Sequence, residues 1–104
     1  MPFTGKEDHS ISLQEASKLT ANYRRRAGEK AVLGGYFGRE AIERILAQER
    51  CVGIRYYFAE TDKGQPTVVL VGVDEKGEDL VEGFLAEVSW PCPPYCGSKN
   101  PLTA

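Results

Sequence analysis

The sequence contains a single histidine, His9, and this scarcity removes most of the familiar acid–base chemistry. Histidine is the commonest general base, and no second histidine is present to complete a His-Glu-x-x-His zinc helix. The chain also lacks a Gly-x-Ser-x-Gly nucleophile elbow and a phosphate loop that ends in Gly-Lys-Ser/Thr. These absences favour a protein that is not an enzyme, and we interpret His9 as a solvated side chain.

Long apolar runs are absent, and neither sign of charge dominates. No segment approaches the roughly 20 apolar residues that a membrane-spanning helix needs. Residues 1–8 are polar and acidic, which is unlike the basic and then apolar start of a signal peptide. The formal net charge is -2, whereas nucleic-acid binders usually show a basic excess. We therefore expect a cytoplasmic protein that binds neither membranes nor nucleic acid.

Cysteine is also scarce. Three cysteines in 104 residues are too few for a disulfide scaffold, and their odd number leaves at least one thiol unpaired. Apolar residues make up 41% of the chain, which is enough to form a core without covalent staples. We expect a single domain over residues 1–104, with a flexible lead-in over 1–10 and a Pro/Cys-rich tail over 91–104.

The first half of the sequence has the periodicity of helices. Ser12 and Glu15 match the capping-box pattern, apolar residues follow at helical spacing, and Gly28 is placed to end a helix over 13–27. Its last turn carries three consecutive arginines, which we interpret as a solvated end that suits the helix dipole. A second helix is predicted over 39–49, because its apolar positions form one narrow stripe.

A glycine-rich segment separates the two predicted helices. Residues 31–38 contain three glycines, which disfavours a long helix there. We expect a short extended piece or a loop that carries Tyr36 and Phe37 inward.

The second half of the sequence changes to the composition and alternation of β-strands. Residues 51–59, 67–73 and 83–90 are predicted strands, and residues 78–82 are ambiguous. Short connecting turns imply that neighbouring strands are antiparallel. We predict an α+β fold in which two helices pack on a three-stranded or four-stranded antiparallel sheet, followed by the Pro/Cys-rich extension.

The most distinctive segment is Pro-Cys-Pro-Pro-Tyr-Cys-Gly at residues 91–97. In a polyproline conformation, the Cα atoms of Cys92 and Cys96 would lie about 12 Å apart, which is too far for a disulfide. A turn through Pro94 and Tyr95 would bring them into range. Three alternatives stay open from the sequence: reduced and partly buried thiols, a disulfide, or a metal site.

A zinc site would need further ligands. Cys51 and His9 are the remaining soft candidates beside Cys92 and Cys96, but the paired two-residue cysteine spacing of a strong zinc motif is missing. We therefore expect no cofactor, with zinc as the alternative.

Arg55 is a charge in the middle of a predicted strand, on the same face as Tyr57. If that face is covered, Arg55 needs a carboxylate partner, because burying an unpaired charge is very costly. The candidate partners are Glu60, Asp74 and Glu87. We interpret Arg55 as solvent-facing or structurally paired, and the carboxylates in the turn at 78–79 as solvated. The alternative is that Arg55 contacts a ligand in a pocket that is also lined by Tyr36, Phe37 and Tyr57.

The runs at 11–16, 45–48, 51–57 and 71–74, together with the segment Pro-Cys-Pro-Pro-x-Cys at 91–96, resemble a group of small hypothetical proteins from Bacteroidota-type bacteria. The likeness covers most of the chain. It implies a free-standing bacterial domain and brings no activity, cofactor or catalytic residue with it.

Rigid aromatic and proline residues without catalytic groups favour a module that binds another protein or a second copy of itself. The expected interaction surface consists of Trp90, Pro93, Pro94 and Tyr95. One alternative is a thiol-based redox sensor or metal-binding domain that uses Cys92 and Cys96, with Cys51 as a further candidate. The other alternative is a small-molecule binding domain with its pocket around Arg55.

Overall fold

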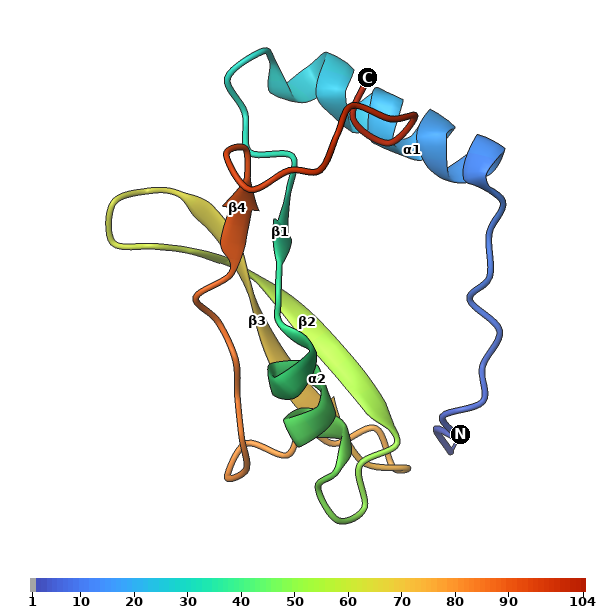
Figure 1. Ribbon diagram of the computed structural model, residues 1–104. Coiled ribbons are helices and arrows are strands. Elements are labelled where there is room, and N and C mark those ends of the chain that lie inside the picture. The colour runs from blue at the N-terminus through green and yellow to red at the C-terminus, as the bar shows by residue number, and fades with distance from the viewer. Residues whose placement is uncertain (1) are drawn as a thin grey trace.

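The computed structural model describes residues 2–104, which form two helices and four strands (Figure 1). The strands make two separate antiparallel sheets of two strands each. The α+β class predicted from the sequence is confirmed, whereas the single sheet of three or four strands is wrong, because the four strands divide into two sheets.

Helix α1 spans Leu13–Ala27, as the sequence predicts. The Ser12 hydroxyl accepts a hydrogen bond from the backbone N–H of Glu15 at 3.0 Å, which satisfies one of the free donors at the helix start. Gly28 ends the helix with φ 92°, a conformation that favours glycine, and its N–H donates to the Arg24 carbonyl. No residue of α1 is buried.

The C-terminal residues lie across α1 (Figure 1). The Arg24 guanidinium donates hydrogen bonds to the carbonyls of Leu102 at 2.7 Å and Ala104 at 2.8 Å. The interpretation of the arginine cluster as a solvated end is therefore wrong for Arg24, which binds the C-terminal residues to α1 through these two hydrogen bonds.

Helix α2 spans Arg39–Leu46 and is shorter than the predicted 39–49, because Ala47 forms the C-cap and the chain turns over the next residues. Strands β2, Gly53–Glu60, and β3, Pro66–Val73, form an antiparallel hairpin that confirms two of the predicted strands.

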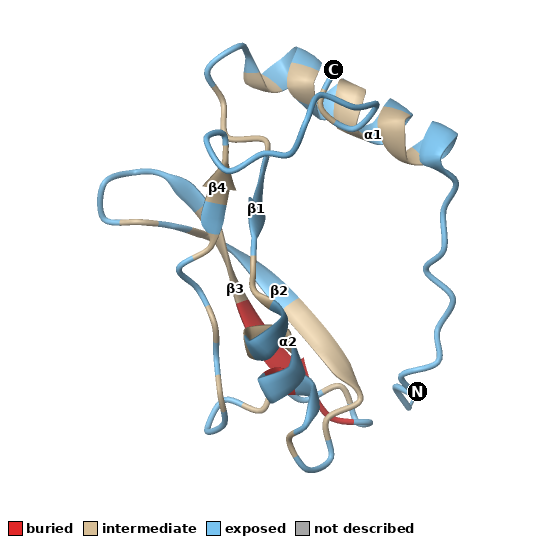
Figure 2. Ribbon diagram, viewed as in Figure 1, coloured by how far each residue is buried: buried red, intermediate tan, exposed pale blue. Residues whose placement is uncertain are grey.

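The core is small and lies where α2 packs on β3 (Figure 2). Ile45 of α2 is fully buried, and three β3 side chains are almost fully buried. These are Leu70, Val71 and Val73. Because α2 has only eight residues, it covers one end of the hairpin and leaves the other end open.

The predicted strand over 83–90 does not form as a third strand of the hairpin. Leu70 and Ala86 exchange two backbone hydrogen bonds in one isolated bridge. The Phe84 N–H, two residues earlier in the chain, donates to the side-chain Oε1 of Gln48 at 2.8 Å. This N–H is therefore not available for backbone pairing with β3. Trp90–Cys92 then forms β4, which pairs with β1 at Gly34–Tyr36. Pro91 and Cys92 therefore belong to a strand, and the Pro/Cys-rich extension predicted to begin at residue 91 is not confirmed.

The segment before α1 returns to the hairpin. The Phe3 N–H donates to the Glu75 carbonyl at 2.6 Å, and the Phe3 ring lies against Gly77. Figure 1 shows this arm running from the N-terminal end of α1 back toward the start of β2.

Candidate functional site

The two-stranded ribbon of β1 and β4 brings three aromatic rings together. Its register sets Tyr36 opposite Trp90, and their ring centroids are 5.7 Å apart. The Tyr95 ring also packs on Trp90, and the centroids of these two rings are 5.0 Å apart. All three side chains are about half exposed, at 54%, 53% and 57% for Tyr36, Trp90 and Tyr95. We call these three residues the aromatic cluster.

A disulfide between Cys92 and Cys96 holds the aromatic cluster in place. The two Cα atoms are 4.8 Å apart, because the chain turns back at Tyr95, whose N–H donates to the Pro91 carbonyl at 2.9 Å. Of the three alternatives left open by the sequence, the structure contains the disulfide. Pro93 and Pro94 are exposed at the outside of this turn.

A groove of about 500 Å³ runs beside the aromatic cluster, between the start of α2 and the segment 84–90. Phe37, Phe84 and Val88 supply much of its apolar lining. The Arg44 guanidinium lies over the Phe84 ring, 4.1 Å from its centroid, and so caps one wall with a positive charge.

The expectation that Tyr36 points inward is wrong, because its side chain is 54% exposed. Phe37 is half-buried and lines the groove. These two residues lie apart from Arg55, which lines a different cleft. The single pocket predicted to combine Arg55 with Tyr36 and Phe37 is therefore not formed.

Arg55, Tyr57 and Asp79 form a hydrogen-bonded network on one face of β2. The Arg55 guanidinium donates to Asp79 Oδ1 at 2.6 Å and to the Gly77 carbonyl at 3.0 Å. The Tyr57 hydroxyl donates to Asp79 Oδ2. The hydrogen bond to Asp79 raises the pKa of Arg55 above its ordinary value, and the same carboxylate raises the pKa of Tyr57.

None of the predicted carboxylates is the partner of Arg55. The turn carboxylate Asp79, which the sequence led us to interpret as solvated, occupies this place with a side chain that is 20% exposed. The sequence signal for Asp79 is weak, because its loop at 78–82 has neither helical nor strand periodicity. Its position depends on the isolated bridge between Asp79 and Val73.

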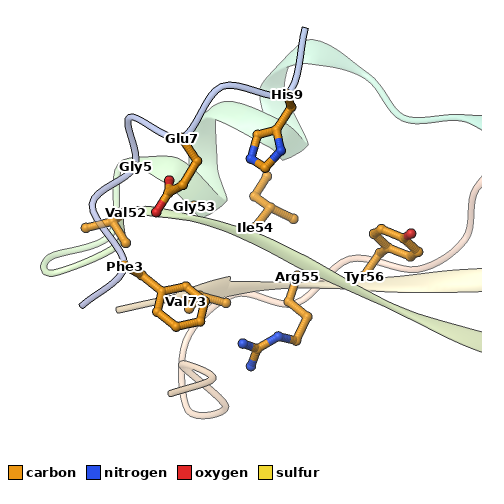
Figure 3. Close-up of a pocket in the computed structure, with 10 residues that line it drawn as sticks. All are labelled: Phe3, Gly5, Glu7, His9, Val52, Gly53, Ile54, Arg55, Tyr56 and Val73. Atoms are coloured by element: carbon orange, nitrogen blue, oxygen red, sulfur yellow. The ribbon is translucent and has the colours of Figure 1, made fainter. Parts of the chain in front are cut away.

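A second cleft, of about 500 Å³, lies between the N-terminal arm and the first half of β2. Figure 3 shows Phe3, Glu7 and His9 along the arm, with His9 above Ile54 and the Arg55 side chain directed away from His9. Since Arg55 already bonds Asp79 and Gly77, its charge is compensated within the protein, and the small-molecule alternative stays a prediction.

The zinc ligands considered from the sequence are not assembled. Cys51 carries a free thiol that donates to the Gly53 carbonyl at 3.2 Å, while the other two cysteines are joined in the disulfide. Across residues 2–104, no three histidine, cysteine or acidic side chains lie close enough together to hold a metal ion.

Comparisons with protein-family models, with curated proteins and with solved structures found no match to this chain. The resemblance to small bacterial proteins therefore stays a prediction. Neither helix in the described part of the chain is long and apolar enough to cross a membrane.

Proposed function

We propose that this protein is a self-associating interaction module, whose partner is a second copy of the same chain. The observation that carries the proposal is its unusually large surface. By the scaling of surface with mass, a compact monomer of 11.5 kDa exposes about 5,800 Å². This chain exposes 8314 Å².

The surplus of about 2,500 Å² is larger than the total area of a standard protein interface, about 1,200–2,000 Å². The radius of gyration agrees, since it is 15.3 Å against about 13 Å for a compact domain of this length. A core of four well-buried apolar side chains is also small for 104 residues. The monomer leaves apolar surface exposed to water, and association of two copies would bury part of that surface.

Two apolar surfaces support an interface. One is the aromatic cluster, which the disulfide and the turn hold rigid, so that little side-chain entropy is lost on binding. The other is the open half of the β2–β3 hairpin, where the Phe58 side chain is 85% exposed. Aromatic side chains are typical anchors of protein interfaces.

Sedimentation equilibrium of the oxidised protein over a wide range of concentrations tests the proposal. We expect the mass to rise from 11.5 kDa toward twice that value as the concentration increases. A mass that stays at that of one chain throughout would overturn self-association.

A second candidate function follows from the disulfide itself. Cys96 is exposed and Cys92 is half-buried, so external thiols such as glutathione can reach the bond. In the two-electron exchange, two external thiols are oxidised to a disulfide while the Cys92–Cys96 disulfide is reduced to two thiols. We propose that a redox change would then release Tyr95 from Trp90. Equilibration in glutathione buffers, read out by Trp90 fluorescence, tests this function. A bond that stays oxidised across the range of cytosolic buffers would contradict it.

A further inference from the structure

We propose that the second copy attaches along the free edge of β2, so that two hairpins join into one four-stranded antiparallel sheet. This inference rests on the proposed self-association and names its surface. The new contact would be backbone pairing between the second half of β2 and the same segment of the other copy.

The outer edge of β2 is free in the described part of the chain. β2 pairs with β3 along its whole length, and no further strand pairs with its other side within residues 2–104. β3 is occupied on both sides, because Leu70 also bonds Ala86 and Gly72 accepts from the Leu80 N–H. Unpaired N–H and C=O groups along a strand edge are a template for another strand.

β2 has few of the features that usually protect an edge strand, since Arg55 and Glu60 are its only charged residues. Its eight residues contain neither lysine nor proline, which are common protective residues at sheet edges. Its one cation, Arg55, is directed to Asp79 and is held there by the short ion pair. The middle of the strand is aromatic and exposed, at 61%, 47% and 85% for Tyr56, Tyr57 and Phe58.

The N-terminal arm decides which half of the edge is accessible. The arm and the cleft beside it occupy the surroundings of residues 52–56 (Figure 3). The second half lines this cleft only at its border residue Tyr56, and residues 57–60 do not line it. A partner strand is therefore expected to pair with this half.

A two-fold axis near Phe58 satisfies these restrictions. Antiparallel pairing about this axis would set Phe58 opposite Phe58 of the second copy and Tyr56 opposite its Glu60, so no like charges face each other. Tyr56 and Phe58 already contact edge to face within one copy, with ring centroids 5.6 Å apart. The dimer would gather four such rings on one face of the new sheet.

The substitution Phe58→Lys tests the surface in the full-length, oxidised protein. It places one cation on each side of the axis, and we expect it to raise the dimer dissociation constant at least about tenfold. Val81→Lys is the matched control, since Val81 is 65% exposed and lies outside the hairpin. We expect it to change the dissociation constant less than about twofold. The double variant Trp90→Ala/Tyr95→Ala probes the aromatic cluster as the rival surface.

Amide hydrogen exchange gives a second readout that does not depend on a variant. We expect those amides of residues 56–60 that point away from β3 to become at least about tenfold more protected as the wild-type concentration rises through the dissociation constant. If the wild type never dimerises, both the proposed function and this inference fail. If it dimerises with unchanged protection at 56–60, or if only the aromatic-cluster variant dissociates it, self-association stands and the β2 edge is overturned.

Discussion

Gln48 is joined to Phe84 by a hydrogen bond of 2.8 Å that links the end of α2 to the segment after the loop at 78–82. The same side chain donates from Nε2 to the Ile45 carbonyl at 2.9 Å. It lies so close to the backbone of Gly83 that a methyl group there would overlap its Oε1 atom. One amide side chain thus holds together parts of the molecule that are 36 residues apart.

The substitution Gly83→Ala is expected to displace Gln48 and leave the Phe84 N–H without its acceptor. Loss of a partly buried hydrogen bond of this kind costs about 1–3 kcal/mol in the free energy of unfolding. Urea denaturation provides the measurement. Gly97→Ala is the control, since nothing lies within 4 Å of a methyl group at that position, and equal losses for both variants would contradict the role of Gln48.

Ile45→Ala is expected to reduce the free energy of unfolding by about 2–5 kcal/mol, because it removes buried methyl groups and leaves a cavity. Ile45 is fully buried, whereas its neighbour Leu46 is 47% exposed. Leu46→Ala should therefore cost less than about 1 kcal/mol. Chemical denaturation of the two variants compares them directly. A smaller loss for Ile45→Ala than for Leu46→Ala would show that the core lies elsewhere.

Asp79→Asn is expected to lower the pKa of Tyr57 toward its ordinary value of 10.0. In the wild type, the carboxylate of Asp79 favours the protonated phenol, so the pKa in the folded state is raised. The contribution of protonated Tyr57 to the stability of the folded protein is complete below the pKa of Tyr57 in the unfolded state. It is lost as the pH rises through the pKa of Tyr57 in the folded state. Ultraviolet absorbance titration of tyrosinate measures the change, with Tyr57→Phe identifying the signal. An unchanged titration in Asp79→Asn would contradict the network.

Asp74 is expected to contribute to sensitivity to acid. The backbone N–H groups of Glu78 and Lys76 donate to its Oδ1, and Arg50 lies 3.8 Å from its Oδ2, so its pKa is lowered. Its stabilising effect is present above the ordinary value of 3.8 and is lost as the pH falls through the lower folded-state value.

The expected result is that Asp74→Asn flattens the fall in urea midpoint between about pH 5 and about pH 2. Asp62→Asn serves as the control, because Asp62 is an exposed carboxylate in the turn between β2 and β3. If the two variants have the same acid profile, Asp74 is not the controlling group.

The double variant Cys92→Ser/Cys96→Ser should lose about 2 kcal/mol of stability, since the disulfide closes only a short loop in the unfolded chain. Its clearer signature is expected in Trp90 fluorescence, because the Tyr95 ring is no longer fastened 5.0 Å from Trp90. Cys51→Ser is the control, since this free thiol lies outside the disulfide. Unchanged Trp90 emission in the double variant would show that the turn alone holds the ring.

Local signals in the sequence were sufficient for the elements that depend on near neighbours. Helix α1 follows from the Ser12 cap, its periodic residues and Gly28, and the β2–β3 hairpin follows from two alternating runs around a turn. Each cap, periodic pattern and turn depends on residues that are close together in the sequence, so the sequence alone is enough to predict the element.

Tertiary structure alone decided the remaining features, because each depends on groups far apart in sequence. Alternation at 83–90 indicated a third strand of the hairpin. In the structure, the Phe84 N–H donates to the Gln48 side chain, and Trp90 pairs with β1. Arg55 needed a carboxylate on physical grounds, yet only the fold selected Asp79 among several acidic residues. Cys92 and Cys96 could have been thiols, metal ligands or a disulfide, and the turn at Tyr95 brought their Cα atoms to 4.8 Å. Composition determines which groups are present, whereas the distances that give them a role arise only when the chain folds.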